Sequence, residues 1–165
     1  MAETLAQTIV DFFKGTIPPE LTVFIVSLMP ILEIRGGMIA AKLLDVNLIS
    51  AFFISYLGNM VPIPFIILFI RQIFTFLRRF KFFEKIILKL EAKTEKNKDK
   101  ILKYEQWGLL IFVAIPLPGT GGWTGALMAA LLDIPMKKSF PIIALGVLIA
   151  GFIMTLLTYG LFWFA

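Results

Sequence analysis

The stretch MPILEIRGG, residues 29–37, puts a proline, a glutamate, an arginine and two glycines in the middle of the apolar segment 21–44. A second apolar segment, 106–132, is interrupted by PLPGTGGWTG, residues 116–125. Crossing a hydrocarbon core of ~30 Å takes about 20 residues of continuous helix, and each half of these segments offers only roughly 8–14. Backbone groups released by proline and glycine cannot face lipid. We therefore predict that both segments are re-entrant helical hairpins that turn back at mid-membrane; two complete but kinked spans are the alternative.

The composition is that of an integral membrane protein. Of the 165 residues, 59% are apolar and 16% are charged, whereas soluble domains have about 45–50% and about 25%. Two segments without a charged residue, 48–70 and 139–165, are long enough to be transmembrane helices. The expected fold class is therefore all-α integral membrane, with two full spans and two hairpins.

The chain contains no histidine and no cysteine. This excludes the zinc, haem, iron–sulfur and thiol chemistry on which many small sites depend. We expect no cofactor and no metal site. Glu33 and Asp45 alone provide no activated nucleophile, so we also expect that the protein is not an enzyme.

An internal repeat relates the two halves of the chain. A shift of 88 residues aligns a proline, a glycine and an aspartate with the same residue types: Pro30 with Pro118, Gly37 with Gly125 and Asp45 with Asp133. Helix breakers that recur at corresponding positions are typical of transporters built from structural repeats. We predict repeat 1 at 18–70 and repeat 2 at 106–165, each a hairpin followed by a span. Chance similarity between two apolar segments is the alternative.

Most of the positive charge lies between the two repeats. Segment 71–105 holds 11 of the 16 lysines and arginines, which places it in the cytoplasm by the positive-inside rule. This distribution explains the net charge of +5 without a nucleic-acid partner. If segment 106–132 is a hairpin, Lys137 and Lys138 also lie on the cytoplasmic side, and the repeats have opposite orientations. We therefore expect a multi-pass protein of the plasma membrane built as an inverted repeat.

Residues 1–17 are predicted to form an amphipathic helix at the membrane interface. Leu5, Ile9, Phe12 and Phe13 share one face of such a helix, and polar residues occupy the rest. Two prolines at positions 18 and 19 then end it.

Ionisable residues at membrane depth are costly and, by default, functional. Glu33 is the first candidate for a proton-linked carboxylate. Arg35, two residues on, is its partner or a ligand for an anionic headgroup. Asp45, at the end of the first hairpin, is a candidate second acid. The structural alternatives are a Glu33–Arg35 pair that only neutralises itself and an Asp45 that only terminates a helix.

The two hairpin tips are the second group of candidates. Glycine and proline leave backbone N–H and C=O groups free to hold an ion or a polar headgroup. The second tip lacks the Gly-Lys-Ser/Thr ending of a nucleotide-binding loop. The predicted cradle comprises Gly36, Gly37, Pro118, Gly119, Thr120, Gly121, Gly122, Trp123 and Thr124. Close helix packing through small residues is the alternative.

Two further polar residues are candidates for the cavity. Asn59 is the one strongly polar side chain in segment 48–70, and it faces the cavity or bonds another helix. Asp133 ends the second hairpin, where a purely helix-terminating role is the alternative.

These motifs resemble a known family. Glu33-Ile-Arg-Gly-Gly37 followed by Asp45, the tip at 116–125 and the basic segment between them are similar to the small multidrug export proteins, over roughly residues 20–160. That family resembles, more remotely, the DedA-like membrane proteins. The likeness implies paired re-entrant hairpins and either proton-coupled export or translocation of a lipid carrier.

In the DedA-like group an acidic pair on the first hairpin and arginines on the second are the functional residues. Glu33 and Asp45 match the acidic pair in place and spacing. The second hairpin of this chain has no arginine, so Arg35 is the residue that would supply the cation.

Together these features predict a small proton-coupled transporter that exports a small or amphipathic substrate through a midplane site formed by the two hairpins. Two full spans enclose little volume, so we expect a homodimer or larger. A lipid or lipid-carrier flippase or scramblase is the alternative. The second alternative is a non-transporting membrane assembly factor, with the charged segment 91–103 as its partner surface.

Overall fold

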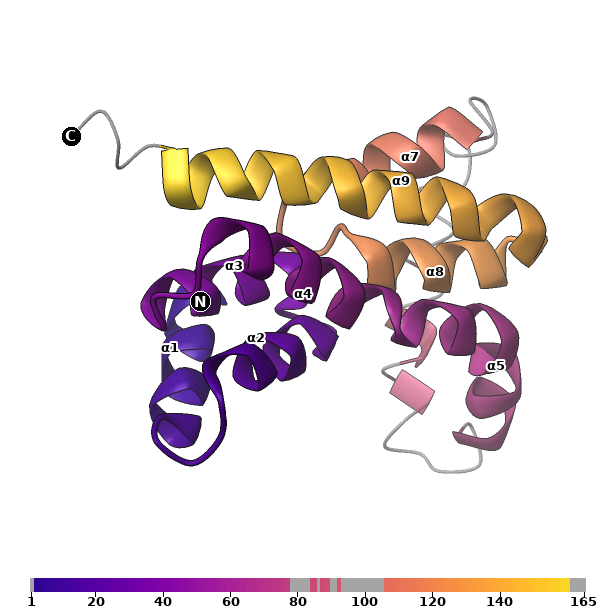
Figure 1. The fold of residues 1–165 in the computed structure, drawn as a ribbon. Helices are drawn as coiled ribbons and strands as arrows, with labels where there is room; N and C mark the ends of the chain where they lie inside the picture. The colour runs from indigo at the N-terminus through magenta and orange to yellow at the C-terminus, as the bar shows by residue number, and fades with distance from the viewer. Residues whose placement is uncertain (1, 78–83, 86, 90–91, 93–105, 161–165) are drawn as a thin grey trace.

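The computed structural model describes residues 2–77, 84–85, 87–89, 92 and 106–160, and the regular structure of this part is helical throughout (Figure 1). The basic segment predicted at 71–105 falls largely outside the described residues, as does nearly all of segment 91–103. Their cytoplasmic location and helical form therefore stay predictions.

The first hairpin consists of two half-length helices, α2 (Pro19–Leu28) and α3 (Glu33–Leu43). Proline suits the first turn of α2, because the missing N–H would have no partner there. The helix ends where Met29 takes an extended ψ of 137° ahead of Pro30. At ~1.5 Å per residue each helix is about 15–17 Å long, half of the hydrocarbon thickness.

The second apolar segment is divided in the same way. Helices α7 (Gln106–Ala114) and α8 (Gly122–Leu131) are joined by residues 115–121. In this loop Gly119 and Gly121 have φ of +83° and +118°, a region that favours glycine. The four hairpin helices have 9 to 11 residues each, whereas a complete span needs about 20.

Two helical runs are long and apolar enough to cross a membrane, Leu48–Ile70 and Met136–Gly160. The first combines α4 (Leu48–Met60) with most of α5 (Pro62–Leu77). The second combines α9 (Met136–Thr155) with a single π-helical turn, Leu156–Gly160. The predicted all-helical class with two membrane-capable helices is thus confirmed.

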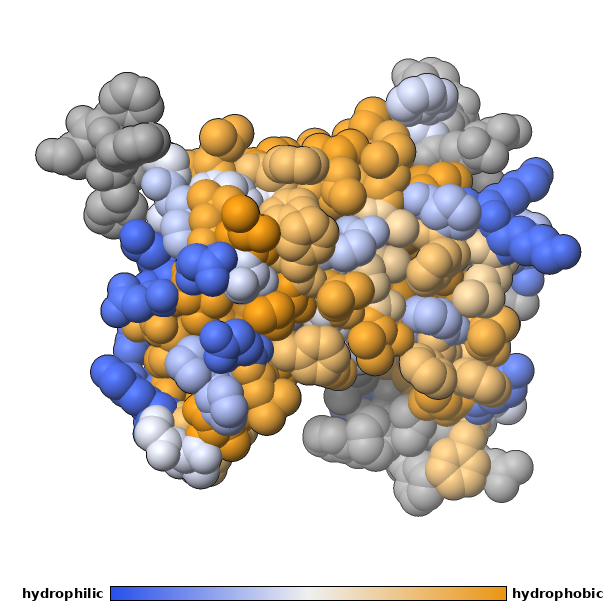
Figure 2. Space-filling model, viewed as in Figure 1, coloured by the Kyte–Doolittle hydropathy of each residue, from blue (hydrophilic) through white to orange (hydrophobic). Residues whose placement is uncertain are grey.

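The surface of the molecule suits an apolar solvent. In Figure 2 apolar side chains cover the middle of the face shown, and the most hydrophilic residues gather at its two ends. Large apolar side chains stand exposed on the long helices, with Phe53 at 59%, Phe65 at 62% and Phe152 at 56%. A contiguous apolar surface of this kind would be unfavourable in water.

Helix α1 (Ala2–Phe13) packs against α3. Its protein-facing side is formed by Ala6 and Val10, which are almost completely buried. Leu5 and Phe12, two members of the predicted interfacial face, stay exposed, Phe12 at 76%. The arrangement leaves that face available for the membrane interface, the location predicted for residues 1–17.

Glycines at corresponding positions of the two repeats lie against corresponding neighbours. The offset is 88 residues between α3–α4 and α8–α9, and 86 between α2 and α7, because the two hairpin loops differ in length. The matched contacts are Gly37 against Ser27 and Ser55, Gly125 against Val113 and Ile143, Gly58 against the Phe24 carbonyl and Gly146 against the Leu110 carbonyl. The predicted similarity of the two halves therefore extends to their internal packing.

Both hairpins also end with the same backbone geometry. Asp45 and Asp133 follow α3 and α8 with φ of +54° and +58°. In each case the next N–H donates to the carbonyl five residues back at 2.9 Å, from Val46 to Ala41 and from Ile134 to Ala129. This is the Schellman arrangement, in which the residue after the helix takes a left-handed conformation.

The Schellman position predicts the effect of substitutions at Asp45. Glycine adopts a positive φ without steric cost, so we expect Asp45→Gly to raise the free energy of unfolding by about 0.5–1 kcal/mol. Asp45→Ala keeps the Cβ atom, which is unfavourable at a positive φ, and loses the carboxylate that makes this conformation tolerable for aspartate. It should therefore lower the free energy of unfolding. Thermal unfolding of the purified protein in detergent measures both. Destabilisation by glycine and not by alanine would contradict the assignment.

Candidate functional site

Glu33 lies where the two hairpin tips meet. It begins α3 with φ of +51° and is 1% exposed. The backbone N–H of Gly122, the first residue of α8, donates to Glu33 Oε2 at 3.0 Å. One tip thus supplies a carboxyl group and the other a helix N-terminus, whose free N–H groups and positive dipole end favour a negative partner.

Gly121 leaves room for this contact. A Cβ atom at this position would overlap the Glu33 carboxyl group, and the φ of +118° is itself unfavourable for any other residue. Gly121 is also the residue that corresponds to Glu33 after the shift of 88. The two equivalent positions therefore touch each other at the centre of the molecule.

Arg35 connects the same two tips by a second route. Its guanidinium group donates to the backbone carbonyls of Leu117 and Thr120, the latter at 3.2 Å. The Thr120 hydroxyl donates to the Ile115 carbonyl at 2.6 Å and accepts from the Leu117 N–H at 3.1 Å, which holds the loop in shape. Arg35 therefore pairs with two carbonyls of the loop that precedes α8, while Glu33 pairs with the N–H that begins this helix.

The expected direct pair between Glu33 and Arg35 is not formed. Residues two apart on a helix point to different sides, so the two side chains reach different parts of the opposite tip. Each of the two side chains thus has a hydrogen-bond partner in the opposite hairpin.

Several buried polar atoms near the junction have no hydrogen-bond partner. They are Glu33 Oε1, Ser55 Oγ, both amide atoms of Asn59, and Trp123 Nε1. Each such atom costs about 1–3 kcal/mol, which is why they are rare in folded proteins. Asn59 is fully buried, and a Cβ atom on Gly122 would lie 3.3 Å from its Nδ2. The junction is a polar cluster inside an apolar protein.

Helix register places Asn59 opposite Glu33. Gly37 on α3 lies against Ser55 on α4, and the two helices form a hairpin with a short connection. One turn from this contact toward the tip, the facing residues are Glu33 and Asn59. Helix α4, the first part of the long run Leu48–Ile70, therefore contributes to the site along with both tips. Ser55 was not among the residues predicted from the sequence. Its spacing of four from Asn59, which places both on one face of a helix, was the only indication in the sequence.

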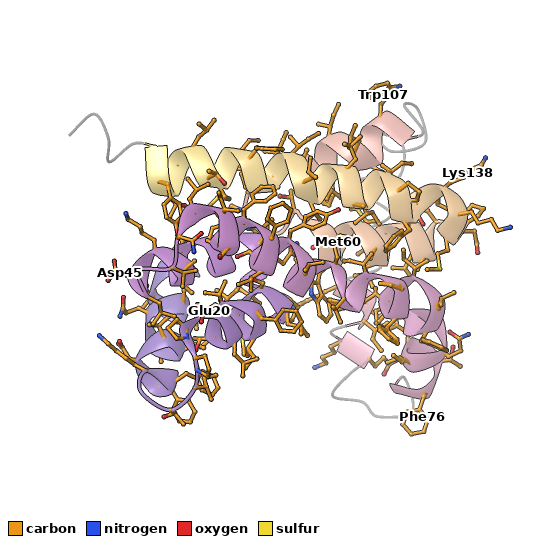
Figure 3. All side chains as sticks on the ribbon, viewed as in Figure 1. Glu20, Asp45, Met60, Phe76, Trp107 and Lys138 are labelled. Atoms are coloured by element: carbon orange, nitrogen blue, oxygen red, sulfur yellow. The ribbon has the colours of Figure 1, made fainter. Side chains whose placement is uncertain are left out.

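Asp45 and Asp133 lie outside the junction. Both are exposed at the far ends of α3 and α8, and about 16 Å of helix separates Asp45 from Glu33. Figure 3 shows Asp45 at one end of the molecule and Met60, the neighbour of Asn59, near its centre. Asp45 and Asp133 both have a left-handed backbone conformation, which gives them a helix-terminating role.

The predicted cradle residues divide into three groups. Thr120, Gly121, Gly122 and Trp123 lie at the junction. Gly36 and Gly37 allow close packing instead, against Leu32 and against the two serines already named. Pro118 and Gly119 are exposed in the loop, and Thr124 is half-buried in α8.

The described residues contain no group of three or more acidic side chains that could hold a metal ion. A single buried carboxyl group near an unpaired amide is suited to exchanging a proton and to hydrogen bonding a polar group.

A family model described as "Putative small multi-drug export protein" matches residues 33–153, which is most of the chain. The chain belongs to this family. The match to the small multi-drug export family begins at Glu33 and includes α3, the loop of the second hairpin, Asn59 and most of α9. No curated protein and no solved structure matches the chain significantly.

The contact between Gly121 and Glu33 can be tested by a double-mutant cycle. We expect Gly121→Ala to destabilise the protein strongly, because the new methyl group displaces the carboxyl group and strains the backbone. In a Glu33→Ala background the collision disappears and only the backbone cost remains. The penalty for Gly121→Ala should therefore be smaller there by about 0.5–3 kcal/mol, measured by thermal or denaturant unfolding in detergent. Equal penalties in the two backgrounds would show that the two residues do not touch.

Proposed function

We propose that this protein is a small proton-coupled exporter whose substrate passes the junction of the two hairpin tips. The observation that carries the proposal is the buried Glu33 carboxyl group, with one oxygen on the Gly122 N–H and the other without a partner. A buried carboxylate needs donors, whereas the protonated group is itself a donor. Uptake and release of a proton therefore change which neighbours Glu33 binds.

Re-entrant hairpins that enter from opposite faces fit the arrangement of the helix ends. In Figure 3 Glu20 and Asp45, at the two ends of the first hairpin, lie toward one end of the molecule. Trp107 and Lys138, which flank the second hairpin, lie toward the other end. Helix α9 runs in the opposite direction to α4 in Figure 1. A hairpin of two half-length helices whose ends lie on one side of the membrane reaches only mid-membrane.

Contacts between the repeats support a two-fold arrangement. Gly122 packs against Ile63, and Gly151 packs against Ile34, which is the same contact after the repeats are exchanged. In a two-fold interface each contact occurs twice in this way, and residues on the axis meet their own equivalents. Inverted repeats in transporters place the substrate and ion site on this axis near mid-membrane.

The substrate we propose is small or amphipathic, and export is the activity named in the family description. Protons, the lipid bilayer and a second copy of the chain are the proposed partners, because two full spans enclose little volume. The proposed location is the plasma membrane, with no cofactor and no enzymatic reaction.

Proteoliposomes with a pH gradient test the role of Glu33, with ethidium as the transported probe. Glu33→Gln keeps the size of the side chain and an oxygen for the Gly122 N–H, but it cannot release a proton. We expect normal insertion and a loss of proton-driven ethidium transport of tenfold or more. Glu20→Gln, which alters an exposed carboxylate, is the matched control and should transport like the wild type. Full transport by Glu33→Gln would remove the proposed role.

A second candidate, movement of lipid headgroups, is favoured by Arg35, a half-buried cation at the junction with a geometry suited to phosphate. A phospholipid with a fluorescent headgroup, added to the same vesicles, separates the two functions. Lipid movement without a pH gradient and unaffected by Glu33→Gln would replace export by a flippase or scramblase activity. Movement of neither probe would favour the assembly factor.

A further inference from the structure

Arg35 and Trp123 occupy corresponding positions in the two repeats, 88 residues apart. Each lies in the first turn of the second helix of its hairpin, α3 or α8. Each also carries an N–H donor on a large side chain. The correspondence of their surroundings is supported by the matched glycine contacts of the two halves.

The two donors are used differently in this structure. Arg35 reaches the loop of the other hairpin and donates to the carbonyls of Leu117 and Thr120. The indole Nε1 of Trp123 is buried and has no partner. Since an unpaired buried donor is costly, a conformation that gives Trp123 an acceptor gains free energy at this position.

The repeat also indicates where the acceptor lies. Leu117 and Thr120 belong to the loop 115–121, and the corresponding segment of the first hairpin is the turn 29–32 between α2 and α3, which includes Ile31. Ile31 is 65% exposed. The first backbone bonds of α3 go to the carbonyls of Met29 and Leu32, so the Ile31 carbonyl between them is not used by that helix.

We propose that Arg35 and Trp123 are alternating donors. In this inference, which rests on the proposed transport function, the two hairpins exchange conformations during the transport cycle. Arg35 then releases Leu117 and Thr120, and the Trp123 N–H donates to the Ile31 carbonyl. Arg35 stabilises the state described here, and Trp123 stabilises the state that opens to the other face.

The indole signals in a ¹⁵N–¹H NMR spectrum of the full chain in detergent test this exchange. The chain has three tryptophans, so the Trp123 signal can be assigned with Trp123→Phe. Arg35→Met removes the donor of the present state, because methionine has no N–H group. We expect the Trp123 N–H signal to move downfield, to exchange more slowly with water and to show a cross-peak to Ile31. Arg35→Lys, which retains one donor group, should give a smaller shift of the same sign.

Lys138→Gln is the matched control, because it removes an exposed cation at the end of the molecule, away from the junction. It should leave the Trp123 signal unchanged. A Trp123 signal that is the same in Arg35→Met, Arg35→Lys and the wild type would overturn the proposal. This measurement needs no substrate, so its outcome is independent of the ethidium assay of Glu33→Gln.

Transport provides a second, separate readout. Trp123→Phe keeps an aromatic ring and removes the N–H, which makes no bond in the present state, together with part of the indole. We expect only a small change in unfolding temperature and ethidium transport at least tenfold slower. Trp107→Phe, at a side chain that is 68% exposed, should transport like the wild type. Wild-type transport by Trp123→Phe would overturn the role of its N–H even if the NMR shift were observed.

Discussion

The hydrogen bond from the Gly122 N–H to the Glu33 carboxyl group is the interaction on which the rest of the structure depends. A helix that stops inside a bilayer leaves backbone groups that lipid cannot satisfy. Here side chains of the first hairpin bind the interrupted backbone of the second: Glu33 offers a carboxyl group to the N-terminus of α8, and Arg35 donates to the carbonyls before it. Gly121 permits this contact because a side chain there would occupy the space of the carboxyl group.

Much of this arrangement follows from local sequence signals. Prolines and glycines in apolar segments predicted where the helices break, since those residues cost most inside a helix. The spacing of 88 predicted that the two halves would match, and the Schellman ends at Asp45 and Asp133 do so. The sequence could not separate a site residue from a helix-terminating one, because an aspartate after Leu-Leu fits both roles. Only the fold shows that Asp45 is remote from Glu33.

Other features of the site depend on tertiary contacts that periodicity does not encode. Glu33 and Arg35 are neighbours in the chain and suggested an ion pair, yet each finds a partner in the opposite hairpin. The sequence left two roles open for Asn59, facing the cavity or bonding another helix. Its register with Glu33 follows only once Gly37 is seen against Ser55. The repeats are also unequal at the site itself, with Glu33 opposite Gly121. Such inequality between equivalent positions gives the junction two distinct sides.

Single-cysteine labelling from the two sides of a vesicle tests the central arrangement most directly, because the chain has no cysteine of its own. Cysteine replaces, one at a time, Glu20 and Asp45 at the ends of the first hairpin and Trp107 and Lys138 beside the second. A maleimide that cannot cross the membrane should label the first two positions from one side and the last two from the other. Labelling of the Glu20 and Asp45 positions from opposite sides would contradict the account, since segment 21–44 would then cross the membrane completely.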